Sequence, residues 1–429
     1  MTAPLKVAVA GLGTVGGALV RILSERRAGL AERCGRAIEI VAVSARDRAK
    51  SRGVDLGGIP WHADARALAR TDADVVVELV GGAEGPGADL VRAALEAGKS
   101  VVTANKALLA EHGVALARLA EERGLHLRYE AAVAGGIPII KALREGLVAN
   151  RILSVQGILN GTSNFILSRM EETGASFAAA LAEAQSLGLA EADPTFDVDG
   201  TDAAHKLAIL ASLAFGVVPD PAAVHKDGIA GITELDIRSA RDLGYSVKLL
   251  ARAERREDGV LQRVHPALVP HASPLSHVTG AENAVTVEGD AVGRAVLQGE
   301  GAGGGPTASA VLADLADIAR GLPAGPVFGL PAGRLAPARA LALAEREGAY
   351  YLRLKVMDRP KVMAAVADIL GEAEVSIDEI RQPHHLPSEP VSIVLTTHRA
   401  QEAVMDAAVA RLAAHPALTS APRLVRIEE

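Results

Sequence analysis

A lysine and an aspartate spaced four residues apart begin a segment that turns almost wholly apolar further on. In FDVDGTDAAHKLAIL (196–210), Asp202 and Lys206 fall on the same face of a predicted α-helix. A surface ion pair at the start of the helix is one interpretation. The other is a polar first turn that faces a cleft, where a lysine ammonium can donate a proton and a carboxylate can fix the lysine rotamer. The rest of the chain has to decide between them.

A glycine-rich turn near the amino terminus predicts a nucleotide site. Gly11-Leu12-Gly13-Thr14-Val15-Gly16 directly follows an apolar strand and precedes a helical pattern. In this context the first glycine makes the turn, and the second lets the backbone approach a pyrophosphate at the helix N-terminus. The motif therefore predicts a dinucleotide-binding βαβ unit, with a tight turn without ligand as the alternative.

The end of the second predicted strand selects the cofactor. An NAD site usually carries an acid there to hold the ribose hydroxyls, but no acid precedes Arg46, and Arg48 and Lys50 follow it. A guanidinium can pair bidentately with a 2′-phosphate, so we expect NADP(H), with NAD(H) as a poorer substitute. A solvated charged loop is the alternative, and Asp47 weighs toward it.

Composition excludes several classes of protein. The chain has 429 residues, 49% of them hydrophobic, a net charge of −7 and only 2% aromatics, so nucleic-acid binding is not expected. The single cysteine, Cys34, fits a reducing compartment. We see neither a signal peptide nor an apolar run of membrane-spanning length, and we expect a cytoplasmic protein without a membrane partner.

The pattern of elements predicts an α/β protein with three domains. Strands apolar on both faces alternate with helices over 1–136, which predicts a Rossmann-type doubly wound parallel sheet, completed by the helix at 306–321. Residues 137–305 have α+β patterning and form a predicted substrate-binding and dimerisation domain. The Pro- and Gly-rich segment 322–348 reads as a linker. Residues 349–429 form a third unit of strand, helix, two strands, helix and strand.

The chain resembles homoserine dehydrogenases through a series of motifs in the same order: GLGTVG, VELVGG, TANKALLA, YEAAVAGGIPII, LNGTSNFIL, GLAEADPTFDVDGTDAAHKLAIL and GEGAGGGPTASAV. This resemblance covers essentially residues 1–325, and the terminal unit is similar to a ferredoxin-like ACT domain, a small-ligand regulatory module. It implies reversible hydride transfer between NAD(P)H and aspartate 4-semialdehyde, giving L-homoserine, in threonine and methionine biosynthesis. It also implies a homodimer or higher homo-oligomer and an amino-acid effector, threonine, although Lys361 stands where ACT domains usually have glycine.

The resemblance also implies roles for individual residues. Lys206, Lys106 and Asp202 are the candidate catalytic residues, and either lysine could donate the proton. The substrate-binding residues implied are Gly161, Thr162, Glu191, Asp197, Asp202 and Lys206. The candidate cofactor-binding residues, from the motifs and the resemblance together, are Gly11, Gly13, Thr14, Val15, Gly16, Arg46, Arg48, Thr103, Lys106 and Gly301. A structural sodium ion is expected on the backbone carbonyls of Glu130, Val133, Gly135 and Ile137.

Two other functions stay open from the sequence. One is a different NADP-dependent oxidoreductase of a small amino-acid semialdehyde. An aspartate-semialdehyde dehydrogenase would need a nucleophilic cysteine, and Cys34 precedes the second strand, away from the expected active edge. The other is a non-enzymatic NADP and amino-acid sensor, which has no need of two lysines with Asp202. Among the histidines, His205 is expected on the helix surface and the adjacent pair His384 and His385 in a loop.

Overall fold

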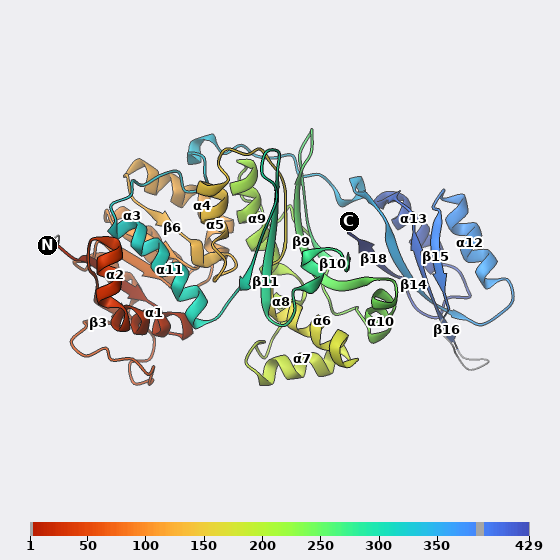
Figure 1. Ribbon diagram of the computed structural model, residues 1–429, viewed down its shortest axis with the longest axis horizontal. Coiled ribbons are helices and arrows are strands. Elements are labelled where there is room, and N and C mark those ends of the chain that lie inside the picture. The colour runs from red at the N-terminus through yellow and green to blue at the C-terminus, as the bar shows by residue number, and fades with distance from the viewer. Residues whose placement is uncertain (1–2, 383–389, 429) are drawn as a thin grey trace.

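The protein is elongated, and its three parts follow one another along the long axis (Figure 1). The computed structural model describes residues 3–382 and 390–428; His384 and His385 lie outside the described residues. Within those ranges, none of the helices has the length and apolar character that a membrane crossing requires.

A six-stranded parallel sheet forms the first domain and confirms the predicted Rossmann-type fold. Its order is β3-β2-β1-β4-β5-β6. The strands are β1 (Leu5–Ala10), β2 (Ile38–Ser44), β3 (Trp61–His62), β4 (Val75–Glu78), β5 (Ser100–Thr103) and β6 (Leu127–Arg128). The edge strand β3 was not predicted, because two residues are too short to show a period. The helices are α1 (Thr14–Glu25), α2 (Arg27–Cys34), α3 (Pro86–Glu96) and α4 (Lys106–Glu122), with a 3₁₀ turn at Ala65–Arg70.

Helix α11 (Gly304–Ala319) returns from the second domain to the first. It packs along α1, and its buried Val311 and Leu315 share one apolar cluster with Val9 and Leu19. Because burying large aliphatic side chains contributes about 1.5–3 kcal/mol each, this returning helix holds the two domains in a fixed relation.

The second domain is a mixed sheet with helices packed on it. The strands are β7 (Ile152–Ile158), β8 (His225–Lys226), β9 (Tyr245–Arg255), β10 (Val260–Pro270), β11 (Glu282–Gly289) and β12 (Gly293–Glu300). The longer helices are α6 (Gly161–Thr173), α7 (Phe177–Ser186), α9 (Thr201–Phe215) and α10 (Glu234–Asp242). Short turns lie at Glu130–Ala132, α5 (Ile139–Lys141), Ala142–Gly146, α8 (Thr195–Val198) and Pro274–His277. Strands β9, β10 and β11 were predicted, whereas β7, β8 and β12 were not.

The third domain has the predicted order of elements. They are β14 (Tyr350–Met357), α12 (Val362–Glu372), β15 (Ile377–Arg381), β16 (Pro390–Thr397), α13 (Glu402–Ala413) and β18 (Arg423–Ile427). A small ribbon pairs β13 (Glu347–Gly348) with β17 (Ala400–Gln401). The segment before it carries only 3₁₀ turns, at Ala332–Arg334 and Leu343–Glu345.

The sheets of the second and third domains are one sheet. Strand β18 lies between β14 and β10, and it pairs with β10 in parallel through Ala267 with Arg426 and Leu268 with Ile427. The order along the sheet is β12-β11-β7-β9-β10-β18-β14-β16-β15, and β8 pairs with β10 off this path. Backbone hydrogen bonds therefore run without interruption from one domain into the other.

Asp236 of α10 links the same two domains through its side chain. Its fully buried carboxylate accepts hydrogen bonds from the Tyr351 hydroxyl at 2.9 Å and from Nε of Arg353 at 2.7 Å, both on β14. It also accepts the backbone N–H of Thr233 at 2.9 Å and so closes the capping box of α10. One carboxylate thus caps a helix of one domain and pairs with a cation of the next.

We expect Asp236→Ala to lower the free energy of unfolding by about 3–5 kcal/mol, because it leaves the Arg353 cation without its buried partner. Chemical denaturation of the full chain measures this change. Glu372→Gln is the matched control, since Glu372 pairs with Arg411 on the surface and its loss should change stability by about 1 kcal/mol at most. Equal effects of the two substitutions would contradict the inter-domain role of Asp236.

Candidate active site

The carboxylate of Asp202 lies between two lysines that come from different domains. Its Oδ2 is 2.7 Å from Nζ of Lys206, one turn along α9, and its Oδ1 is 3.1 Å from Nζ of Lys106, at the start of α4. The Asp202 side chain is only 6% exposed. The pair is therefore buried at the boundary of the first two domains, and the surface ion pair considered from the sequence is wrong.

Local sequence explains where each lysine stands. Gly200 precedes α9 in a left-handed conformation (φ 86°), and the apolar residues that follow, among them Leu207 and Leu210, are fully buried. Their burial fixes the rotation of α9 and with it the direction of its polar first turn. On the other side, Asn105 caps α4 through the backbone N–H of Leu108, directly after β5. Lys106 thus stands at the carboxyl edge of the parallel sheet, where such sheets bind ligands.

The two lysines have different surroundings. Nζ of Lys206 also donates to the backbone carbonyl of Leu159 at 2.6 Å, and the Lys206 side chain is 11% exposed. The Lys106 side chain is 31% exposed, and its ammonium lies 5.7 Å from the ring centroid of Phe196. Lys206 is therefore the more firmly positioned of the two.

Asn160 connects this cluster to a second carboxylate, and the sequence analysis missed it. Its Nδ2 donates to Oδ2 of Asp202 at 2.9 Å and to Oδ1 of Asp197 at 2.7 Å. Its Oδ1 accepts the backbone N–H of Ser163 and so caps α6. The signal available was the asparagine before a helix in LNGTSN, which is a capping pattern. Its second role depends on residues 37 and 42 positions away.

Burial and charge affect the two carboxylates in opposite ways. Burial alone would raise the pKa of Asp202, but the adjacent Lys206 and Lys106 ammonium groups outweigh it and hold that pKa below its usual range. Burial raises the pKa of Asp197, which has no lysine at hydrogen-bond distance in the part of the chain that the structure describes. Asp202 therefore stays ionised and cannot itself serve as a proton donor near neutral pH.

The other candidate substrate residues lie around this cluster at differing depth. Gly161 begins α6, where a Cβ would come within 2.6 Å of the Ala281 carbonyl oxygen. The Thr162 hydroxyl donates to the Leu189 carbonyl at 2.7 Å and so holds the loop that carries Glu191. Glu191 itself is exposed and is not brought to Asp202; its backbone carbonyl accepts a hydrogen bond from Gln185.

His205, expected on the helix surface, is half-buried. Its ring packs edge-on against Phe196 with 5.7 Å between centroids, and burial lowers its pKa. Phe196 belongs to α8, which packs against the start of α9 and brings this ring onto His205. Phe196 thus contacts both His205 and Lys106.

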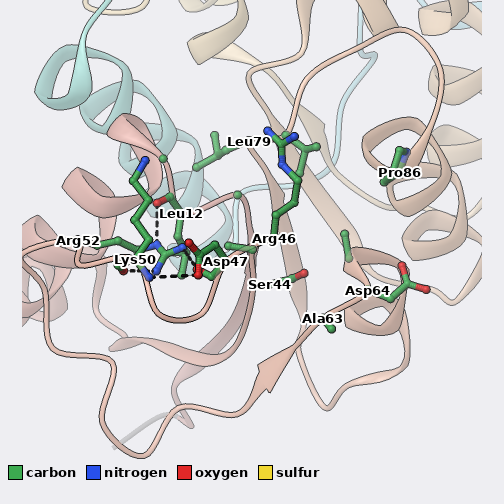
Figure 2. A pocket seen from close by; sticks show the side chains of 15 residues that line it. Leu12, Ser44, Arg46, Asp47, Lys50, Arg52, Ala63, Asp64, Leu79 and Pro86 are labelled. Atoms are coloured by element: carbon green, nitrogen blue, oxygen red, sulfur yellow. Dashed lines mark hydrogen bonds between the residues drawn. The ribbon is translucent and has the colours of Figure 1, made fainter.

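A cavity of about 660 Å³ lies over the glycine-rich turn (Figure 2). Gly11 and Gly13 line it, whereas Thr14, Val15 and Gly16 begin α1 behind them. A Cβ on Gly16 would lie 2.0 Å from the Gly11 carbonyl oxygen, and one on Gly13 would meet nothing within 4 Å. The motif thus combines close helix–strand packing with open space above its second glycine, as a pyrophosphate site requires.

Cations from the end of β2 line the same cavity. Arg46 extends away from the group that Asp47, Lys50 and Arg52 form in Figure 2. Arg48 does not line this cavity but an adjacent hollow. Arg52 was missed by the sequence analysis: it donates to the Leu12 carbonyl at 3.0 Å and stacks on Trp61, which ties the basic loop to the glycine turn.

Two further candidate cofactor residues are packed against other groups. The Thr103 hydroxyl donates to Oε2 of Glu78 at 2.5 Å, and Glu78 also accepts the backbone N–H groups of Val80 and Gly81. Gly301 packs against Asn283 so closely that a Cβ would lie 2.0 Å from the Asn283 side chain. Thr103 therefore positions the turn after β4, and Gly301 permits a close contact between β11 and the loop before α11.

Comparison with known proteins decides the family. Residues 138–316 match homoserine dehydrogenase, residues 11–130 its NAD-binding domain and residues 350–417 the ACT domain. The chain is 45% identical to homoserine dehydrogenase of Pseudomonas aeruginosa, over 99% of both chains. The chain belongs to the homoserine dehydrogenase family.

Solved structures of homoserine dehydrogenases agree with this assignment. The enzyme from Thiobacillus denitrificans superimposes with a TM-score of 0.93 at 44% identity, covering 99% of this chain and 98% of that one. A hyperthermophilic archaeal homoserine dehydrogenase mutant in complex with NADPH has a TM-score of 0.64 at 27% identity, covering 75% and 99%. The chain is thus an NAD(P)-dependent oxidoreductase with an ACT domain, and the non-enzymatic sensor considered from the sequence is wrong.

If Lys206 is the proton donor of this homoserine dehydrogenase, Lys206→Ala should lower kcat by roughly 10²–10⁴-fold and leave cofactor affinity unchanged. Asp202→Ala should fail through a misplaced lysine, so the double variant should be little worse than the worse single one. Steady-state turnover with thermal melts as a folding control measures both effects.

Lys226→Ala is the matched control, because the exposed Lys226 on β8 donates to the Thr201 hydroxyl at the start of α9 and forms no ion pair with Asp202. It should keep near-normal turnover. Near-normal turnover of a folded Lys206→Ala would instead leave Lys106 as the donor.

Proposed function

We propose that Lys206, Asp202 and Lys106 form the proton-transfer machinery for interconverting aspartate 4-semialdehyde and L-homoserine with NADPH. The observation that carries the proposal is the Asp202 carboxylate shared at 2.7 and 3.1 Å by two lysines at the domain boundary. The cofactor supplies the hydride when it is bound. The carbonyl oxygen of the substrate then becomes an alkoxide, which the chain must stabilise and protonate.

Each group suits one part of that task. The Lys206 ammonium has an anchored position, with Asp202 and the Leu159 carbonyl holding two of its three N–H groups, so one remains for the substrate oxygen. Asp202 stays ionised and orients both lysines. Lys106 adds a second positive charge that stabilises the developing oxyanion. In the reverse direction a lysine accepts the hydroxyl proton of homoserine.

The cationic amino group of the substrate needs a carboxylate nearby. Asp197 lies beside Asp202 through Asn160, and we infer that it binds this ammonium. Glu191 stands in the exposed loop that Thr162 holds, so we assign it to the outer side of the same subsite. Pairing with an ammonium would also offset the burial that raises the pKa of Asp197.

For the cofactor we propose NADP(H) over NAD(H). Arg46 lines the nucleotide cavity, and it has no ion-pair partner among the described residues. A bidentate contact with a 2′-phosphate would satisfy this guanidinium. Lys50 on the same cavity adds a second positive charge, whereas the Asp47 carboxylate is turned to the backbone N–H groups of Ala49 and Lys50.

Adding aspartate 4-semialdehyde to the protein with NADPH should therefore give rapid oxidation of the cofactor, faster than with NADH. Because hydrogen bonds to charged groups contribute roughly 1.5–3 kcal/mol, Arg46→Ala should raise KM for NADPH about tenfold or more, with little change for NADH. Arg48→Ala is the control, since Arg48 lies outside the cavity and should leave both constants unchanged. A wild-type preference for NADH would contradict the cofactor assignment.

We also propose a structural sodium ion on the carbonyls of Glu130, Val133, Gly135 and Ile137. In support, the segment is irregular, and Ala134 adopts a left-handed conformation (φ 51°) between two of these residues. Backbone carbonyl oxygens are the ligands that hard cations prefer. The Ile137 carbonyl is the weakest member of the set, because it already accepts the N–H of Ile139 at 2.8 Å.

The ACT domain is a small-molecule-binding module, and we propose threonine as its effector. The turn before α12 carries Lys361, where glycine is usual in this kind of domain. Lys361 is exposed and adopts a left-handed conformation (φ 72°) that glycine reaches without strain. A lysine at this position costs about 1–2 kcal/mol and places a long side chain beside the helix N-terminus.

We expect threonine to inhibit the full-length enzyme and Lys361→Gly to lower the inhibitory threonine concentration, because glycine lets the ligand approach the backbone. The same substitution should raise the melting temperature by removing the strained conformation. Titration of activity with threonine in both proteins measures the first effect, with Lys355→Gly on β14 as a control for lysine loss. No response to threonine in any of these proteins would remove the effector assignment.

We propose a homodimer through the sheet of the second domain. Strand β12 is the free edge of that sheet in the described chain; Val296 on this strand and Val292 directly before it are more than 40% exposed. An exposed edge strand is a ready site for pairing with another chain.

The single buried cysteine, Cys34, suits the reducing cytoplasm.

A further inference from the structure

A second cavity, of about 160 Å³, lies where the second and third domains meet. Strands β9 and β10 form one wall, and the segment around β13 and the end of β18 form the other. Its lining includes five arginines: Arg252, Arg256, Arg263, Arg346 and Arg399. Three glutamates also line it, Glu254, Glu347 and Glu428. Five guanidinium groups against three carboxylates leave an excess of two positive charges.

The innermost part of the cavity is a rigid network. Glu428 accepts hydrogen bonds from Nη2 of Arg263 at 3.1 Å and from Nη1 of Arg252 at 2.8 Å. Nη2 of Arg346 donates to the Ile427 carbonyl at 2.9 Å. The side chains of Arg263 and Arg346 are only 2% and 4% exposed. These arginines are therefore held in place before any ligand arrives.

Some of these buried donors have no acceptor. Nε of Arg263 and Nη1 of Arg346 are buried and donate no hydrogen bond within residues 3–382 and 390–428. Behind the cavity, Glu402 lies 3.6 Å from Nη1 of Arg346 as an ion-pair partner, and it also accepts hydrogen bonds from Arg426. One carboxylate is thus shared by two guanidinium groups, and counting this pair with the lining leaves the excess of two positive charges unchanged. Buried cations without a full set of partners are costly, and an anion bound among them would remove that cost.

We propose that this cavity binds a small dianion of the size of phosphate or a short dicarboxylate. The parallel N–H donors of a guanidinium group match the oxygens of both phosphate and a carboxylate. The two negative charges of such a dianion equal the excess positive charge of the lining. The volume is several times the roughly 30 Å³ that one water occupies, yet it is below the roughly 300 Å³ at which drug-sized ligand pockets begin. A nucleotide is therefore too large. The ligand would bridge the catalytic and ACT domains.

Thermal unfolding of the full chain tests the proposal. Phosphate, malonate and chloride are added separately at constant ionic strength, with NADPH saturating so that the phosphate subsites of the cofactor are filled. A ligand that binds only the folded state raises the melting temperature with a saturable dependence on concentration. We expect such a rise with phosphate or malonate and none with chloride. A rise in melting temperature with phosphate alone would identify an oxyanion site, and a rise with malonate alone would identify a dicarboxylate site.

Two substitutions at the rim attribute the effect to this cavity. Arg399 and Arg256 have side chains 52% and 35% exposed, so Arg399→Gln and Arg256→Gln should fold. Each should raise the half-saturating dianion concentration about tenfold, the loss of one charge-assisted contact. Arg411→Gln is the control, because Arg411 is similarly exposed, pairs with Glu372 and does not line the cavity.

The melting temperatures of these four proteins decide whether the cavity binds a dianion. A dianion response weakened by the two rim substitutions and unchanged by Arg411→Gln supports the site. No saturable response in the wild-type chain, or the same response in all four proteins, overturns it. Because NADPH oxidation with aspartate 4-semialdehyde is measured separately, failure here leaves the proposed catalytic function standing.

Discussion

The carboxylate of Asp202 has partners from two domains, so the site exists only if those domains keep a fixed relative position. Lys206 comes with Asp202 on α9, but Lys106 begins α4 in the other domain. The distance of 3.1 Å between Asp202 and Lys106 is therefore a distance between two folded units. Helix α11 maintains it by leaving the second domain and packing along α1 within the core of the first. A lysine displaced by an ångström would lose its hydrogen bond and its alignment with the substrate.

The local half of the site could be predicted from the sequence, and the remote half could not. The spacing of Asp202 and Lys206 predicted that both lie on one face of a helix, and the glycine motif predicted a nucleotide site at the start of α1. Periodicity carries no information about groups that meet only after the domains assemble. The hydrogen bond from Asn160 to Asp202 and the one from Arg52 to the Leu12 carbonyl are two such long-range contacts. The role of Lys106 came from family resemblance, and its contact with Asp202 from the structure.

The same limit applied to the fold. Long apolar strands such as β9 and β10 were visible in the sequence, and so was the order of elements in the third domain. Strand β12 has no fully buried residue, and its apolar residues Ala295, Val296 and Leu297 are consecutive, so its sequence lacked the apolar pattern of a buried strand. The fusion of two sheets through β18 rests on two residue pairs between Ala267–Leu268 and Arg426–Ile427. No local pattern encodes so distant a pairing.

That pairing also affects how the chain reaches its folded state. Ala267 and Arg426 are separated by 159 positions, so their contact closes a loop that contains the linker and nearly all of the third domain. Hairpins such as β9–β10 close quickly, whereas such distant strands meet late, because loop closure costs entropy before any contact repays it. Until β18 arrives, the part of β10 at Ala267 and Leu268, beyond the residues that pair with β8, is an open edge with unpaired backbone groups. The nascent protein thus passes through a stage in which its catalytic sheet is formed but still able to pair with a neighbouring chain.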